Sequence, residues 1–192
     1  SVNDNKEEVG LAANMTLYGI NGNVIKKIRS YTELQEGAVK MLYRIPQEEL
    51  GFLFLTLKDN EGNIVARNEY CIPAKKDSHN WNKYSWYKTQ VAEYGDYSDL
   101  NKLAQANIRA TVNRWENKIN VTLKNESNVV AFFIRMSLKD KNGNLIVPAF
   151  WDDNLITLAP GETRSLTCQT VCAIPDDAKI TVSGWNVKEQ DL

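Results

Sequence analysis

The chain contains Ile119-Asn120-Val121-Thr122-Leu123, a stretch in which apolar and polar side chains alternate without a break. Alternation with a period of two is typical of a β-strand that buries one face and leaves the other in water. Runs of strand length, rich in Val, Ile, Thr and aromatic residues, occupy 107–115, 118–124, 129–139, 163–171 and 179–187. Gly, Asn, Asp and Pro separate these runs. Short strands at this spacing predict a β-sandwich or barrel.

The sequence also repeats itself. Met15-Thr16-Leu17 returns as Met136-Ser137-Leu138, and Asn-Gly-Asn-Val-Ile at 21–25 returns as Asn-Gly-Asn-Leu-Ile at 142–146. Further on, 34–37 corresponds to 158–161, and each of these segments is expected to lead into another strand. One supersecondary plan used twice predicts an all-β chain of two tandem immunoglobulin-like antiparallel β-sandwiches.

The repeat sets the expected domain boundaries. We predict a first sandwich over 1–73, an aromatic-rich junction over 74–104 and a second sandwich over 105–192. The segment 107–124 supplies two strands ahead of the repeated region in the second copy, whereas only Ser1-Val2-Asn3 stands there in the first. We therefore expect the first sandwich to be truncated at its N-terminus and the chain to be a piece of a longer polypeptide.

The junction is unlike a flexible linker, because it is poor in Gly and Ser and rich in large rings. The strand pattern stops there, and a short helical turn is predicted near 97–103. We expect the rings to pack against one or both sandwiches and to hold them in a fixed relation. The rings are Trp81, Tyr84, Trp86, Tyr87, Tyr94 and Tyr97.

Composition excludes several classes of function. The formal net charge of -1 argues against a nucleic-acid partner. No apolar run is long enough to span a membrane, and no metal or cofactor motif is present in the sequence. The three cysteines, Cys71, Cys168 and Cys172, make no CxxC pair, and we interpret them as buried apolar side chains. Cys168 and Cys172 would lie on one face of a strand, about 13 Å apart and too far for a disulfide.

Catalytic candidates are few. His79 is the single histidine, and we interpret it as a solvent-exposed loop residue rather than a catalytic base. The segments 59–63 and 140–144 lack the closing glutamate of a calcium loop, so we predict hairpin turns in which Gly62 and Gly143 take positive φ. We therefore predict no catalytic residue in this chain.

A candidate sugar contact lies in the segment 150–154, just after a predicted strand. Trp151, Asp152, Asp153 and Asn154 place an aromatic face beside carboxylates and an amide, groups that bind the C–H faces and hydroxyls of a carbohydrate. On residue types alone we favour a core tryptophan followed by a turn, with carbohydrate contact as the alternative. Adjacent carboxylates on extended backbone point to opposite faces, which makes a poor acid/base pair for glycoside cleavage.

These motifs resemble a known family. Six segments, 86–89, 94–101, 131–135, 150–154, 158–162 and 183–186, resemble in order the C-terminal region of glycoside hydrolase family 2 enzymes of the β-mannosidase and exo-β-D-glucosaminidase branch. Residues 1–80 match more loosely, and Tyr70-Cys71 stands where such sequences often carry an aromatic-Trp pair.

The resemblance implies two immunoglobulin-like sandwiches that follow a catalytic (β/α)₈ barrel, with both catalytic glutamates in that barrel. The implied function is a non-catalytic accessory region of an exo-acting glycosidase, which packs on the barrel and helps to line the sugar cleft. The implied partners are that barrel and an oligosaccharide, without cofactor, nucleic acid or membrane. By family analogy the parent is extracytoplasmic. The alternatives are an independent carbohydrate-binding module and a cell-surface adhesion array. With the resemblance, carbohydrate contact by 151–154 has the same weight as a core tryptophan followed by a turn.

Overall fold

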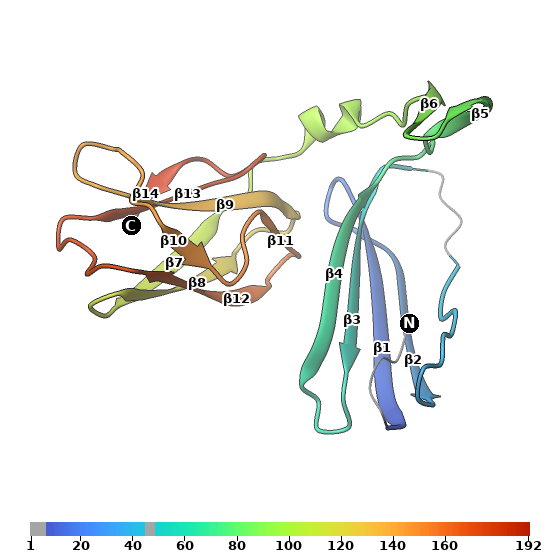
Figure 1. Ribbon diagram of the computed structural model, residues 1–192, viewed down its shortest axis with the longest axis horizontal. Helices are drawn as coiled ribbons and strands as arrows, with labels where there is room; N and C mark the ends of the chain where they lie inside the picture. The colour runs from blue at the N-terminus through green and yellow to red at the C-terminus, as the bar shows by residue number, and fades with distance from the viewer. Residues whose placement is uncertain (1–6, 45–48) are drawn as a thin grey trace. The chain divides into compact units, whose positions relative to one another are not determined.

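The computed structural model describes residues 7–44 and 49–192. The chain divides into two compact units, Ser1–Lys102 and Leu103–Leu192. Both are built from antiparallel strands, which confirms the all-β, immunoglobulin-like prediction (Figure 1). No helix among the described residues is long and apolar enough to cross a membrane.

The second unit is a sandwich of two four-stranded sheets, in the orders β10-β12-β8-β7 and β11-β9-β13-β14. In Figure 1 the layer that contains β8 and β12 lies opposite the layer that contains β9 and β13. The strands are β7 (Ile108–Arg114), β8 (Lys118–Asn125), β9 (Ala131–Lys139), β10 (Ala149–Trp151), β11 (Ile156–Leu158), β12 (Thr163–Thr170), β13 (Lys179–Ser183) and β14 (Gln190–Asp191).

The alternating stretch in β8 builds this core. Ile119, Val121 and Leu123 are all 0 % exposed, while the polar residues between them point to the other face. Their partners across the sandwich come from β9 and β13, where Met136 and Ile180 are also buried. Burial of a side chain of this size contributes about 2 kcal/mol, so the alternation seen in the sequence accounts for much of the stability of this unit.

The first unit contains one four-stranded sheet among its described residues, in the order β2-β1-β3-β4. Its strands are β1 (Val9–Gly19), β2 (Val24–Leu34), β3 (Gly51–Lys58) and β4 (Ile64–Ile72). The segment 34–37 was expected to lead into another strand. That prediction is wrong for the described residues 38–44, which lie in no strand. Tyr43, from that segment, donates a hydrogen bond to the Ala13 carbonyl (2.7 Å) and packs against the cluster of Met15, Leu17 and Leu53.

The repeat of the sequence is a repeat of turn geometry. After β1, Gly19 N–H donates to the Asn23 carbonyl (2.9 Å), and after β9 Asp140 N–H donates to the Asn144 carbonyl (2.8 Å). Gly22 and Gly143 have φ of 82° and 84°, and Gly62 in the β3–β4 turn has φ of 90°. The hairpin prediction for 59–63 and 140–144 is therefore confirmed, with glycine where the left-handed conformation requires it.

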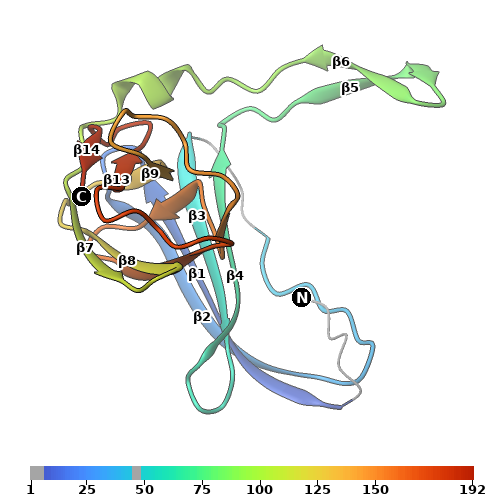
Figure 2. The same cartoon turned by 60° about the vertical axis from the view of Figure 1, so that its left-hand side comes forward.

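The junction differs from the prediction, because it contains strands. Strands β5 (Ser78–Ser85) and β6 (Lys88–Glu93) form a two-stranded hairpin. A 3₁₀ helix, η1 (Ser98–Lys102), follows it at the position of the predicted helical turn. The hairpin is drawn in green in Figure 2. Neither strand of the hairpin buries one face, so its sequence does not alternate between apolar and polar residues. Strand prediction depends on that alternation, and the two strands were therefore missed.

The cysteine prediction is only partly right. All three thiols are free. Cys168 lies in β12 and is buried, and burial raises its pKa to about 11. The half-buried Cys71 has its pKa raised to about 11 for the same reason. Cys172 is exposed, because β12 ends at Thr170 and the chain leaves the sheet before it.

Candidate functional site

Trp151 is the last residue of β10, where it pairs with Cys168 of β12. Its ring is partly buried and packs against the core of the second unit, as a structural tryptophan does. Phe150, its neighbour, points to the opposite face of the strand and is 61 % exposed. The exposed ring of this segment is therefore that of Phe150.

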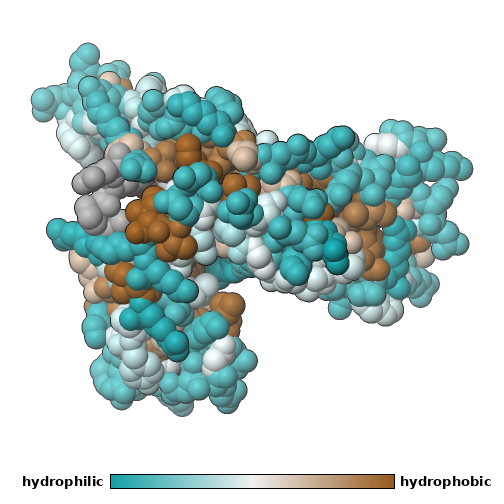
Figure 3. All heavy atoms as spheres, turned by 180° about the vertical axis from the view of Figure 1, so that it is seen from behind, coloured by the Kyte–Doolittle hydropathy of each residue, from teal (hydrophilic) through white to brown (hydrophobic). Residues whose placement is uncertain are grey.

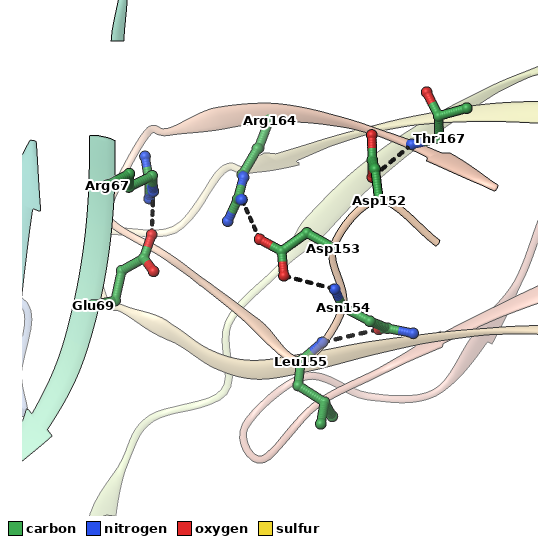
Figure 4. Close-up of polar contacts among 8 residues, drawn as sticks. All are labelled: Arg67, Glu69, Asp152, Asp153, Asn154, Leu155, Arg164 and Thr167. Atoms are coloured by element: carbon green, nitrogen blue, oxygen red, sulfur yellow. Dashed lines mark hydrogen bonds and ion pairs between the residues drawn. The ribbon is translucent and has the colours of Figure 1, made fainter. Parts of the chain in front are cut away.

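The two carboxylates that follow take separate partners (Figure 4). Asp152 makes a reciprocal pair of hydrogen bonds with β12, because its N–H donates to the Thr167 carbonyl (2.9 Å) and its Oδ1 accepts from the Thr167 N–H (3.0 Å). Asp153 forms an ion pair with Arg164 and accepts the N–H of Asn154 (2.8 Å). Both aspartates are exposed, but the contacts that hold them are those of a loop tied to its own sheet.

The Asn154 side chain takes the place of a strand partner for β9. Its Oδ1 accepts the Met136 N–H (2.9 Å), and its Nδ2 donates to the Met136 carbonyl (2.9 Å). Its Oδ1 also accepts the N–H of Leu155 (2.9 Å), a residue with φ of 58°. These bonds leave one amide hydrogen for any other partner.

The predicted sugar-contact residues thus share one loop without converging on a common point. Trp151 faces the core, Asp152 and Asp153 bind β12 residues, and Asn154 binds β9. Each contact shapes the turn between β10 and β11. A sugar-binding role for these residues stays a prediction.

The remaining polar candidates do not assemble a reactive centre in the described part of the chain. His79 lies in β5 rather than in a loop, is exposed as expected, and has its ring 5.7 Å from that of Trp81. Over residues 7–44 and 49–192, no group of three His, Cys, Asp or Glu side chains could hold a metal ion. The thiols with raised pKa values are less available as thiolates at neutral pH than an ordinary cysteine.

A cavity of about 390 Å³ lies in the first unit. Its lining is largely apolar and includes Met41, Leu42 and Tyr43 with Leu53 and Leu55 of β3. Apolar surface of this unit is visible on the left of Figure 3, among polar residues. The cavity offers room for an apolar group, and Asn14, Thr56, Arg67 and Asn68 add polar groups to its lining.

A cluster of exposed aromatic side chains lies on the β5–β6 hairpin. Trp81 is 71 % exposed, Tyr84 62 %, Trp86 85 % and Tyr87 74 %. More than half of each of these four side chains lies in solvent, and a fixed relation between the two sandwiches stays a prediction. Exposed rings on adjacent positions are a signal of an interaction surface, and the sequence had already shown it as an unusual cluster of aromatics.

Comparison with known proteins supplies the family. Residues 86–187 match the family of the exo-beta-D-glucosaminidase Ig-fold domain. Among relatives named exo-beta-D-glucosaminidase, that of Arthroderma benhamiae is 39 % identical over 144 residues, covering 74 % of this chain and 16 % of the relative. That of Amycolatopsis orientalis is 33 % identical over 199 residues, covering 95 % of this chain and 19 % of the relative. The chain therefore spans under a fifth of the length of these two relatives.

Solved structures agree with the sequence relatives. The crystal structure of the Amycolatopsis orientalis exo-chitosanase CsxA matches with a TM-score of 0.85 at 28 % identity, over 100 % of this chain and 24 % of that one. A beta-D-mannosidase from Dictyoglomus thermophilum matches with a TM-score of 0.60 at 16 % identity, over 97 % of this chain and 20 % of that one, which shows a shared fold. These matches confirm the resemblance to the immunoglobulin-like region of glycoside hydrolase family 2 enzymes, and the chain belongs to the exo-β-D-glucosaminidase Ig-fold domain family.

Proposed function

We propose that this chain is a non-catalytic accessory region of an exo-acting family 2 glycoside hydrolase, and that it packs on the catalytic barrel of the same polypeptide and stabilises it. The observation that carries the proposal is the family match over 86–187, in a chain that corresponds to 16 % to 24 % of its relatives and structural neighbours. Most of each relative, with room for a separate catalytic domain, lies outside the region that matches.

The proposed parent activity is hydrolysis of terminal β-D-glucosamine residues rather than of β-D-mannosides. Relatives that are 33 % to 39 % identical carry the name exo-beta-D-glucosaminidase, whereas the mannosidase shares 16 % identity and the fold. The parent would accept chitosan-derived oligosaccharides, and this region would help to line the cleft that receives them.

The test compares this chain with the parent polypeptide on an aryl β-D-glucosaminide and an aryl β-D-mannoside. We expect the 192-residue chain to release no product from either compound and the parent to release it from the glucosaminide. Activity that copurifies with the isolated chain through two different columns would refute the non-catalytic role. Preference of the parent for the mannoside would refute the substrate assignment.

A carbohydrate contact at the β10–β11 loop is the second candidate, because Phe150, whose ring is exposed, and the exposed Asp152 are separated in the sequence by Trp151 alone. Phe150→Ala is a sharper probe than Trp151→Ala, since the Trp151 ring packs against the core and its loss would disturb folding. If the loop binds sugar, titration calorimetry with glucosamine oligomers gives a signal that Phe150→Ala weakens and Phe133→Ala, a matched exposed ring on β9, does not. Equal binding by both variants would place the contact elsewhere.

A further inference from the structure

The tip of the β5–β6 hairpin combines exposed rings with an uncompensated positive charge. From residue 78 to residue 92 the sequence contains Lys83 and Lys88 and no Asp or Glu. Both lysines are exposed, as are the four rings of Trp81, Tyr84, Trp86 and Tyr87. In a chain whose net charge is -1, this segment is therefore a local basic and aromatic surface.

The two ends of the hairpin are joined to each other at its base. Lys75 and Glu93 form an ion pair (2.6 Å), and the Gly95 N–H donates to the Asp77 carboxylate. A Cβ at Gly95 would lie 2.9 Å from the Lys75 carbonyl, so glycine is needed where the two chain segments meet. The rings at the tip are ordered with respect to each other, since the Trp86 and Tyr87 centroids lie 5.2 Å apart in an edge contact. A closed base and the contact between Trp86 and Tyr87 favour preorganisation of this surface.

The exposed rings are of the type that dominates protein interfaces. Tryptophan and tyrosine are enriched at the energetic centres of interfaces because a large apolar face is combined with one hydrogen-bonding group. Four side chains of about 200 Å² each, exposed to this degree, offer at most about 600 Å² to one partner. A stable interface between separate chains needs about 800 Å² on each partner. The tip alone is thus too small for a tight dimer, whereas a partner tethered in the same polypeptide binds at an effective concentration in the millimolar range.

The charge decides the chemistry of the occupant. A glucosamine chain carries ammonium groups, which Lys83 and Lys88 would repel. A protein surface with an apolar depression and carboxylates at its rim would attract both lysines and cover the rings.

We propose that the tip of the β5–β6 hairpin docks into an apolar, carboxylate-rimmed surface of the catalytic barrel in the same polypeptide. This inference rests on the proposed function, because it takes the occupant to be the barrel of the parent enzyme. It assigns to Trp81, Tyr84, Trp86 and Tyr87 the role of anchors, and to Lys83 and Lys88 that of charged contacts at the edge.

The test is hydroxyl-radical footprinting of the parent polypeptide and of this 192-residue chain, with oxidation of Trp81 and Trp86 read by mass spectrometry. We expect oxidation of both tryptophans to be about fivefold slower in the parent, as for anchors that become buried. The double variant Lys83→Glu/Lys88→Glu in the parent should return the rate close to that of the isolated chain. The matched control is Lys26→Glu/Lys27→Glu, which reverses two exposed lysines on β2 and should leave the protection unchanged.

Equal oxidation of Trp86 in the parent and the isolated chain would overturn the inference. Protection of these tryptophans in the isolated chain by glucosamine oligomers, by vesicles of anionic lipid or by dimerisation would also overturn it. Each of these results would mean that something other than the barrel covers the hairpin tip. If deleting the whole region destabilises the barrel while Trp86 stays unprotected, the hairpin inference fails and the accessory function stands. If the deletion leaves the barrel unchanged, the accessory function itself fails.

Discussion

Asn125 shows how single polar side chains hold the second unit together. It is 0 % exposed, and its Nδ2 lies within hydrogen-bonding distance of the carbonyls of Val129 (2.8 Å), Leu158 (3.2 Å) and Ala159 (3.1 Å). Its Oδ1 accepts the Ser127 N–H (3.0 Å). A single amide thus joins backbone groups of the β8–β9 connection to the end of β11.

Asn125→Ala should lower the free energy of unfolding of the second unit by about 3 kcal/mol, because buried carbonyls lose their donor. Asn120→Ala is the matched control, since Asn120 makes one long contact with Thr167 (3.4 Å) and should cost under about 1 kcal/mol. Urea unfolding followed by tryptophan fluorescence measures both. Equal small effects in the two variants would contradict the importance of the Asn125 network.

The Asp140 carboxylate in the β9 turn should titrate below its ordinary pKa of 3.8, chiefly because it accepts the Asn144 side-chain N–H. A pKa that is lower in the folded than in the unfolded state stabilises the fold above about pH 3.8, and this contribution disappears as pH falls through the folded pKa. NMR titration of the carboxyl carbon should give a midpoint below 3.8, which Asn144→Ala should raise. A wild-type midpoint at or above 3.8 would show that the turn does not favour the charged form.

At the scale of elements, the strands that sequence could predict are those with a buried face. The pattern of β8 identifies it because Ile119, Val121 and Leu123 alternate with polar residues. The three-residue strands β10 and β11 are too short to show a period, and β5 and β6 are too exposed to show one. The sequence could predict which segment, 151–154, carries the candidate site. It could not predict which partners the side chains of that segment bind. The bond of Asn154 to Met136 joins residues that are brought together by the fold alone.

The glycine turns allow the two units to be perturbed separately. A Cβ at Gly143 or Gly62 would meet no atom within 4 Å, so an alanine there costs backbone strain alone, about 1–2 kcal/mol. We expect Gly143→Ala to destabilise the second unit and Gly62→Ala the first. Hydrogen exchange of β8 and of β1 distinguishes the two effects. Acceleration of exchange in β8 by Gly62→Ala would mean that the units do not unfold independently.

At the scale of the whole molecule, the proposed accessory role rests on what the described residues build. The chain's described residues build one sandwich of two four-stranded sheets, a separate four-stranded sheet and an exposed aromatic hairpin. Its functional candidates are surfaces rather than a convergent set of reactive groups. The matched region corresponds to a small share of each relative, so the role of the chain is best understood within a larger polypeptide.

The most direct test of that role is the thermal unfolding of the catalytic barrel in the parent polypeptide, with and without the region 1–192, followed by calorimetry together with glucosaminidase activity after heating. If the region packs on the barrel and stabilises it, its removal lowers the melting temperature of the barrel by on the order of 5 °C or more and shortens the lifetime of activity at elevated temperature. A barrel that melts at the same temperature and retains activity equally well without the region would contradict the account.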